Sequence, residues 1–211
     1  MRLLKLSTLA LVLALALATP GASAPQTSPV VYKLDAARSR FVVRAFAGGV
    51  LWFKGHDHFV AARDFTGEAR LTPGAVSPAS LTLTVRADSL AETRDVFTEQ
   101  QKKIINGELR DIVLEPAKYP EITFRSTDVA AESGAGGVFK VKLGGDLTLR
   151  GVTRRVQIPV EVTLDGPTLR ARGEFSVKRS DFKVPATSAF HGTVRVRDRL
   201  KVSFDIVARR D

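Results

Sequence analysis

Strict alternation of apolar and polar residues is the feature that most constrains the fold of this 211-residue chain. Between Lys118 and Ile158 one parity is apolar, as at Ile122 and Phe124, while the intervening positions are charged or polar and Gly-rich clusters separate the segments. A period of two is typical of antiparallel strands that bury one face. The stretch therefore predicts a sheet with one dry and one solvated face.

The same pattern recurs on both sides of this stretch. Alternating segments occupy 31–35, 40–46, 65–71, 81–85, 169–177 and 194–206. Asp165-Gly166 predicts a hairpin, Pro159 a bulge or a seam, and Asp198-Arg199 a further bulge. Eight to ten strands of this kind predict an all-β, antiparallel up-and-down barrel of about eight strands, wide enough to be filled by side chains or to hold one small apolar ligand.

Alternation stops between Thr93 and Leu114, where apolar residues at wider spacing are separated by Glu, Gln and Lys. This pattern predicts one or two short helices, broken near Asn106-Gly107 and capped by Thr93 or Asp95. A helix inserted into a barrel has to bury its apolar side. We therefore expect it to cap one open end of the barrel.

The first 24 residues have the features of a secretory signal peptide. Arg2 and Lys5 precede an apolar run, and Ala22-Ser23-Ala24 supplies the small residues of a cleavage site. The run is too short for a spanning helix, which needs about 20 apolar residues. We expect a mature domain over residues 25–211 that begins near Pro25 and resides in the periplasm.

The mature domain is basic and lacks cysteine. Only two of the 32 basic residues and none of the 22 acidic ones lie in residues 1–24, so the net charge falls from +10 to +8. Lys and Arg mostly occupy outward parity, which favours a solvated surface that meets anionic lipid headgroups before nucleic acid. With no Cys, neither disulfides nor thiolate chemistry is available. The oligomeric state stays open.

Two of the three histidines stand in Gly55-His56-Asp57-His58. On a strand they would share a face and could hold a metal, but two ligands are too few for a zinc site, and His191 is distant in sequence. Hydrogen bonding to backbone or Asp groups at a barrel end is the simpler interpretation. No Gly-x-Ser-x-Gly or His-Glu-x-x-His motif occurs. We expect neither a metal, a catalytic residue nor a cofactor, with a hydrolase at His56 and His58 as the weaker alternative.

Several motifs carry a resemblance. The run from Lys118 to Phe124, followed by Gly145 to Thr153, Arg179-Ser180-Asp181-Phe182 and the final strand, resembles the YceI-like family over about residues 31–208. That resemblance implies an exported, lipocalin-like barrel that holds polyisoprenoid chains, including quinone tails, along its axis in the periplasm. A structural or stress-related envelope protein with a packed barrel is the alternative.

An apolar ligand in such a barrel would contact inward residues near the aromatic cluster and the helical cap. Val50 to Phe53 are four consecutive apolar residues, which indicates either a segment covered on both faces or the mouth of a cavity. The expected ligand contacts are Phe41, Val43, Trp52, Phe53, Phe97, Phe124, Phe139 and Leu147. Small inward residues such as Ala45 and Ala69 are compatible with either a hollow or a packed interior.

Overall fold

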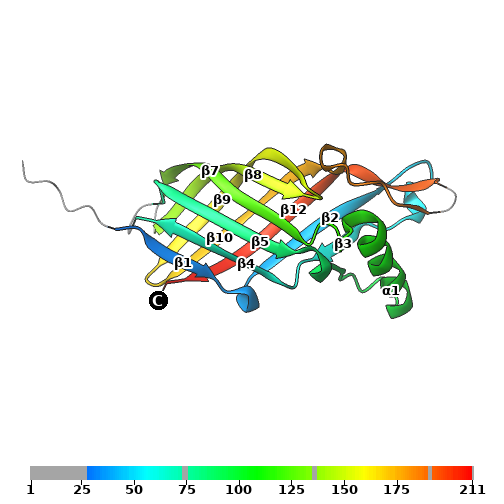
Figure 1. The fold of residues 1–211 in the computed structure, drawn as a ribbon, viewed down its shortest axis with the longest axis horizontal. Coiled ribbons are helices and arrows are strands. Elements are labelled where there is room, and N and C mark those ends of the chain that lie inside the picture. The colour runs from blue at the N-terminus through cyan, green and yellow to red at the C-terminus, as the bar shows by residue number, and fades with distance from the viewer. Residues whose placement is uncertain (1–27, 73–75, 135–136, 190–191, 211) are drawn as a thin grey trace, which may run out of the picture.

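The computed structural model describes residues 28–72, 76–134, 137–189 and 192–210, most of them in strands (Figure 1). The expected signal peptide and His191 lie outside the described residues. The strands are β1 (Val30–Leu34), β2 (Arg40–Gly48), β3 (His58–Ala61), β4 (Phe65–Leu71), β5 (Ala79–Arg86), β6 (Ala91–Glu92), β7 (Glu121–Ser133), β8 (Val138–Leu149), β9 (Val152–Asp165), β10 (Thr168–Lys178), β11 (Ser188–Ala189) and β12 (Val194–Arg209). The helical segments are α1 (Glu99–Glu108), the π-helical η4 (Leu109–Leu114) and the 3-10 turns η1 (Ala36–Arg38), η2 (Trp52–Lys54), η3 (Ala87–Ser89) and η6 (Arg179–Phe182).

The strands form one closed antiparallel barrel. They pair in the order β1-β4-β5-β7-β8-β9-β10-β12-β2-β3-β6, and an additional β1–β12 pairing closes the ring. The segments β1 and β2, β3 and β4, and β5 and β6 follow one another in sequence and pair in matching order on either side of a short break. Each couple is thus one bent strand. The prediction of an antiparallel barrel of eight strands with one short helix is confirmed.

The two ends of the barrel differ. One end, called here the terminal end, carries both ends of the described chain and the β9–β10 turn. The opposite end, called here the helical end, carries the β2–β3 loop, α1, η4 and η6 (Figure 1). Strand direction dictates this division, because each strand of an up-and-down barrel starts where the preceding one ended.

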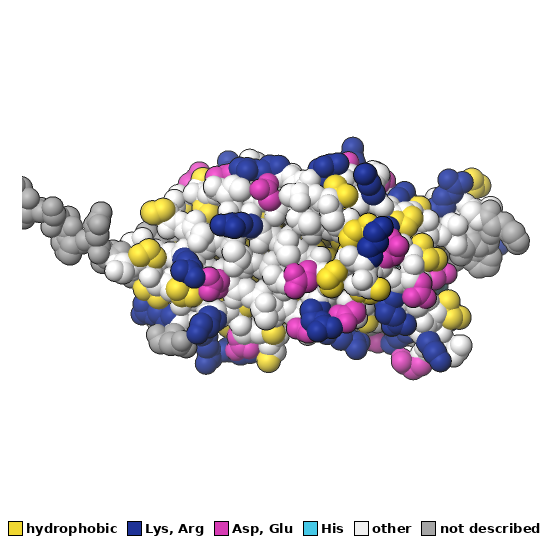
Figure 2. Space-filling model, viewed as in Figure 1, with side chains coloured by type: hydrophobic (Ala, Val, Ile, Leu, Met, Phe, Trp, Pro, Cys, Tyr) yellow, Lys and Arg dark blue, Asp and Glu magenta, His cyan; other side chains and the backbone are white. Residues whose placement is uncertain are grey.

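The outer wall is charged, as the alternation predicts. Lys and Arg side chains are spread over the visible face among Asp and Glu (Figure 2). On the wall formed by β10 and β12, Arg170 and Arg172 both pair with Asp205, at 2.7 and 3.1 Å. Such exposed pairs contribute little to stability, so the interior has to hold the barrel together.

The helical segment differs in detail from its prediction. Thr98 is the N-cap of α1: its side chain accepts a hydrogen bond from the backbone N–H of Gln101, whose side chain in turn accepts from the Thr98 backbone. Capping by Thr93 or Asp95 is therefore wrong. So is the break at Asn106-Gly107, which α1 crosses. The Asn106 amide oxygen accepts the Glu92 backbone N–H at 2.8 Å, a tertiary contact that replaces the expected turn.

Two predicted irregularities and one hairpin are present. β9 pairs with β10 only from Val160 to Asp165, so the ladder ends beside Pro159 and a seam opens there. The β12–β2 register shifts between Val196 and Leu200, as Asp198-Arg199 predicted. Gly166, at φ +53°, forms the β9–β10 turn. Among the described residues no helix is long and apolar enough to cross a membrane.

Candidate binding cavity

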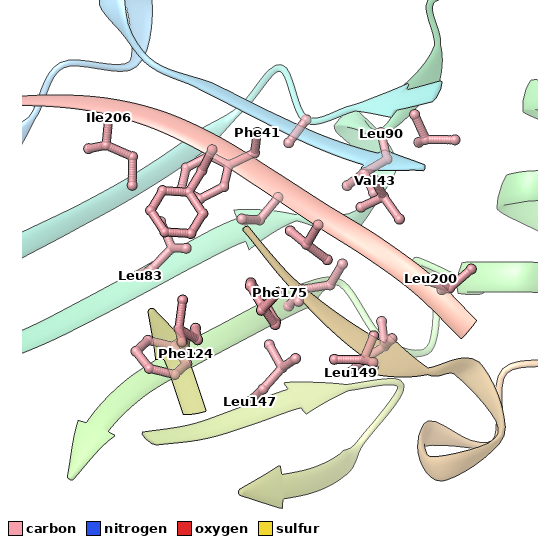
Figure 3. A pocket seen from close by; sticks show the side chains of 18 of the residues that line it. Phe41, Val43, Leu83, Leu90, Phe124, Leu147, Leu149, Phe175, Leu200 and Ile206 are labelled. Atoms are coloured by element: carbon pink, nitrogen blue, oxygen red, sulfur yellow. The ribbon is translucent and has the colours of Figure 1, made fainter. Parts of the chain in front are cut away.

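The barrel encloses a cavity of about 350 Å³ that extends along its interior (Figure 3). Most of its lining side chains are inward-facing apolar residues of the strands. Those seen most clearly are Phe41, Val43, Leu83, Leu90, Phe124, Leu147, Leu149, Phe175, Leu200 and Ile206. A site of this kind offers contact area and shape rather than directed chemistry.

The interior stays open because large rings lie against the wall. A Cβ on Gly145 would approach the Phe124 ring to 2.4 Å, and one on Gly173 would approach the Phe204 ring to 2.6 Å. Glycine therefore lets each phenyl ring lie flat on a neighbouring strand instead of projecting into the lumen. The small inward residues Ala45, Ala69 and Ala171 border the remaining space.

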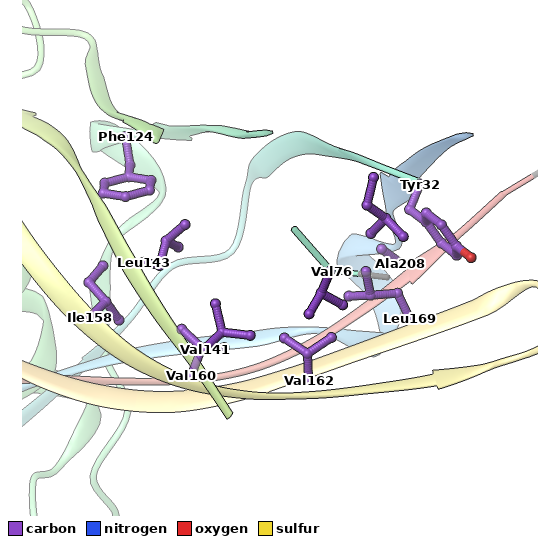
Figure 4. Packing of buried hydrophobic residues seen from close by; sticks show 11 residues of the cluster. Tyr32, Val76, Phe124, Val141, Leu143, Ile158, Val160, Val162, Leu169 and Ala208 are labelled. Atoms are coloured by element: carbon purple, nitrogen blue, oxygen red, sulfur yellow. The ribbon is translucent and has the colours of Figure 1, made fainter. Parts of the chain in front are cut away.

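The terminal end is closed by a packed cluster. Exposure there is 3 to 5% for Tyr32, Leu71 and Leu169, and Ala208 is fully buried. Figure 4 shows Tyr32, Leu169 and Ala208 together with Val76 at one extremity of the cluster and Phe124 at the other. The described residues therefore leave a ligand no exit at this end.

Helical residues cover the opposite end. Ile105 of α1 and the η4 residues Leu109, Val113 and Leu114 line the cavity. Within residues 99–114, called here the lid, η4 is anchored by the buried Leu114, whereas α1 has no buried residue. The α1 part of the lid therefore belongs to the part of a fold that opens at low free-energy cost.

Polar lining residues gather at the lid end. His58, Glu108, Arg179 and Thr187 line the cavity there, whereas Ser80 is the polar lining residue nearer the terminal end. The Arg179 Nη1 donates to the Val184 carbonyl at 2.8 Å, and its Nε is buried without a hydrogen-bond partner among the described residues. The cavity is therefore polar at one end and apolar along its length.

A buried carboxylate fixes His58. Glu92 is 2% exposed, and its Oε2 lies 2.8 Å from His58 Nδ1. Its Oε1 accepts the backbone N–H groups of Phe59, Thr93 and Arg94 at 3.2, 2.9 and 2.9 Å. Because a carboxylate only accepts, Nδ1 is the donor in this contact, and the acceptor of a neutral ring would then be Nε2. Sequence reasoning missed Glu92, since η3 precedes β6 and interrupts the parity that would place it inward.

Asp57 has a different role from the two histidines beside it. Its carboxylate accepts from Arg44 Nε and Nη2 at 2.9 and 2.7 Å and from the Ala47 backbone N–H at 2.9 Å. Partial burial alone would raise the pKa of Asp57, but the hydrogen bonds from Ala47 and Arg44 and the charges of Arg44 and Arg94 outweigh it and hold this pKa below its usual value. Asp57 therefore fixes the β2–β3 loop to β2.

The structure divides the residues expected to contact a ligand into groups. Phe41, Val43, Phe124 and Leu147 line the cavity. Phe139 packs against the adjoining core cluster.

Three others lie outside the cavity. Trp52 and Phe53 are 55% and 62% exposed and border an open groove with His56. The Phe97 ring stacks on His58 at 5.3 Å and meets His56 edge-on at 5.7 Å. Within the described residues, no three His, Cys, Asp or Glu side chains are placed to hold a metal ion.

The comparisons with known proteins agree with this architecture. Residues 32–208 match the model of the YceI-like domain. None of the curated proteins matches the chain.

Three solved structures are similar in fold. BcnA of Burkholderia cenocepacia is 22% identical, with a TM-score of 0.63, over 82% of this chain and 98% of its own. A polyisoprenoid-binding domain from Saccharophagus degradans, implicated in plant cell wall breakdown, is 15% identical, with a TM-score of 0.61, over 86% and 99%. The Campylobacter jejuni YCEI protein is 20% identical, with a TM-score of 0.52, over 72% and 84%.

Proposed function

This chain belongs to the YceI-like family, and from that premise we propose that it is a periplasmic carrier that holds one elongated apolar lipid inside its barrel. The lipid class that we propose is a polyisoprenoid or an isoprenoid quinone. The observation that carries the proposal is the apolar cavity that extends along the barrel and whose polar lining residues, apart from Ser80, gather near the lid. One similar fold is described as a polyisoprenoid-binding domain, which supports the same class here.

The energetics favour an apolar chain without a strong polar anchor. Burial of apolar surface contributes roughly 25 cal/mol per Å², so an extended hydrocarbon can bind through contact with the apolar lining, which includes Phe41, Phe124 and Phe175. A cavity that is already open requires no repacking to admit it. This cavity favours the carrier over a barrel that serves only as a packed structural element.

We place the polar end of the lipid near the lid. In a neutral ring His58 Nε2 would be an acceptor, and Arg179 Nε is buried without a hydrogen bond among the described residues, with Asp198 Oδ1 4.0 Å away. A hydroxyl group could donate to His58 Nε2 or accept from Arg179 Nε, whereas a carbonyl group could only accept from Arg179, and a group left unsatisfied in such a site costs about 1–3 kcal/mol. The closed terminal end would then receive the tail.

Native mass spectrometry of the protein purified from the periplasm of its own cells tests the proposal. We expect one lipid per chain, and chemical extraction should identify an isoprenoid. An empty barrel that also fails to take up quinone from detergent would contradict the carrier function.

Export is proposed from the sequence alone, because residues 1–24 lie outside the described residues. N-terminal sequencing of the protein from the periplasmic fraction should begin at Pro25 or within a residue or two of it. Retention of the leader on soluble protein would contradict export by cleavage at this site.

A further inference from the structure

The large apolar side chains that are exposed among the described residues gather at one end of the molecule. Of the described residues, the exposed large hydrophobic ones are Val50, Trp52, Phe53, Val96, Ile104 and Ile112. All six lie in the β2–β3 loop, before α1, or in the lid, and so at the helical end. Scattered exposed apolar residues need no explanation, but a concentration at one end marks an interaction surface.

Three of these residues form a projection in the β2–β3 loop. Val50, Trp52 and Phe53, called here the aromatic tip, are 83%, 55% and 62% exposed. The Trp52 and Phe53 rings contact edge to face, with centroids 6.4 Å apart. In Figure 1 this loop, between β2 and β3, lies at the end of the molecule opposite the C-terminus.

The backbone holds the tip in this position. The Leu51 N–H donates to the Thr193 carbonyl at 3.1 Å, and Gly49 has φ +90°. A Cβ at Gly49 would lie 2.4 Å from that same carbonyl oxygen, so the close approach requires glycine. The aromatic rings are therefore presented outward by fixed geometry rather than by a freely moving loop.

Positive charge surrounds the aromatic tip. Lys54 follows Phe53 directly, and Arg195 pairs in register with Gly48. Arg195 and Arg197 donate to the backbone carbonyls of Gly192 and Ala47 at 2.8 Å, and neither is paired with a carboxylate among the described residues. A carbonyl does not neutralise a guanidinium, so both charges remain available to an anionic partner.

We propose that the aromatic tip docks the barrel on the surface of an anionic phospholipid bilayer, with the lid facing the membrane. Trp is enriched where headgroups meet acyl chains, because its ring is apolar and its N–H is polar. Each Lys or Arg near an anionic surface strengthens binding about fivefold, as follows from about 1 kcal/mol per basic residue. The combination of exposed aromatic residues with unpaired cations fits this surface.

A second copy of the chain fits the tip less well. A two-fold contact places the same patch of each copy against the other, so the cations Lys54, Arg195 and Arg197 of both copies would be brought into one interface. That juxtaposition of like charges opposes self-association. Docking on a bilayer requires no lipid in the barrel, so its failure would leave the carrier proposal standing.

Trp52 makes the test direct, because it is the only Trp in the chain. The mature protein is mixed with vesicles made of equal parts phosphatidylglycerol and phosphatidylcholine, and with vesicles of phosphatidylcholine alone. We expect co-flotation and a blue shift of Trp emission only with the anionic vesicles, weakened by added salt. Brominated acyl chains should quench this emission.

Three variants separate the contributions. Phe53→Ser keeps the fluorophore and should weaken vesicle binding on the order of tenfold. Lys54→Gln with Arg195→Gln should weaken it about 25-fold, from two steps of about fivefold. The matched control, Lys142→Gln with Arg209→Gln, removes the same charge from exposed positions on the wall and at the terminal end and should bind as the parent does.

The outcomes are distinct. Loss of binding in both tip variants, with the control unchanged and all proteins folded by circular dichroism, supports docking through the tip. Absence of binding to anionic vesicles at low salt overturns it, and so does equal weakening by the control. A dimer in analytical ultracentrifugation that Phe53→Ser converts to a monomer, without vesicle binding by the parent, would assign the tip to a second copy instead.

Discussion

The guanidinium of Arg150 donates a hydrogen bond from Nη1 to the backbone carbonyl of Val113 at 2.7 Å, across 37 positions of sequence. The same nitrogen donates to the Ile112 carbonyl at 2.8 Å, and Nη2 pairs with Glu115. The last carbonyls of a helix have no partner within it. Arg150 supplies that partner to η4 and so fastens the lid to the β8–β9 turn.

This contact accounts for an unusual backbone conformation. Arg150 has φ +50° and Gly151 φ +70°, the pair of positive values that a two-residue hairpin turn requires. An arginine is an uncommon choice at such a position. The Tyr119 ring lies 3.1 Å from where a Cβ of Gly151 would stand. The two halves of the family motif, one around Tyr119 and one around Arg150, thus meet at the lid.

Arg150→Ala should therefore weaken the attachment of the lid. We expect the free energy of unfolding to fall by about 2 kcal/mol. A hydrogen bond to a charged group contributes about 1.5–3 kcal/mol, and the contributions of the three bonds do not add because one side chain makes all of them. Urea denaturation measures the loss, and hydrogen exchange should accelerate in residues 109–114. Arg154→Ala is the matched control, because Arg154 is exposed and donates to the Thr153 carbonyl. Equal stability of the two variants would show that Arg150 does not hold the lid.

The Asp57–Arg44 pair should contribute stability that depends on pH. Because the folded state lowers the pKa of Asp57, the contribution is complete above the unfolded carboxyl pKa of about 3.9 and is lost as the pH falls through the lower folded value. A double-mutant cycle of Asp57→Asn and Arg44→Gln, measured by urea denaturation, should give a coupling of about 1 kcal/mol at neutral pH. The coupling should shrink toward zero at the acid end of that window. A pH-independent coupling would contradict the assignment.

The buried Glu92 should be among the most sensitive positions of the chain. Glu92→Ala leaves three backbone N–H groups and His58 without their hydrogen-bond acceptor, and we expect it to destabilise the fold by about 3 kcal/mol or more. Glu92→Gln keeps one acceptor oxygen and should cost less. Glu161→Ala, at an exposed position of β9, is the control and should change stability by under about 0.5 kcal/mol. If Glu92→Ala unfolds in urea like the control, the carboxylate is dispensable.

Sequence reasoning succeeded where the determinant was local. The period of two gave the inward parity of Phe41 and Phe124, because successive side chains of a strand point to opposite faces. Gly166 and Pro159 marked a turn and a seam through their own backbone limits. None of these predictions needed knowledge of which strands are neighbours.

It failed where distant segments decide the outcome. Trp52 and Phe53 are apolar, but the closure of the β2–β3 loop against Thr193 turns them away from the cavity. The Phe97 ring stacks on His58 instead of entering the cavity, and His58 contacts Glu92, which lies 34 positions away in sequence. Residue type alone does not distinguish an aromatic residue inside a barrel from one beside its mouth.

Filling the cavity should test directly whether the open interior holds the proposed lipid. Ala69 borders the cavity from β4, so Ala69→Phe should place its ring in space that is open in the parent. Overpacking a filled core costs about 1–3 kcal/mol, and we expect a smaller loss here. The same ring should displace the bound lipid, because the two would occupy one volume.

The measurement pairs lipid retention, by native mass spectrometry, with the midpoint of urea unfolding. Thr82→Phe, on the exposed face of the adjoining strand β5, is the matched control and should keep both. Loss of lipid in Ala69→Phe with its midpoint preserved supports a carrier whose ligand lies in the barrel. Lipid retained at the level of the parent would place the ligand elsewhere, and a midpoint lowered by the full overpacking cost would mean that the interior has no room for a chain beside Ala69.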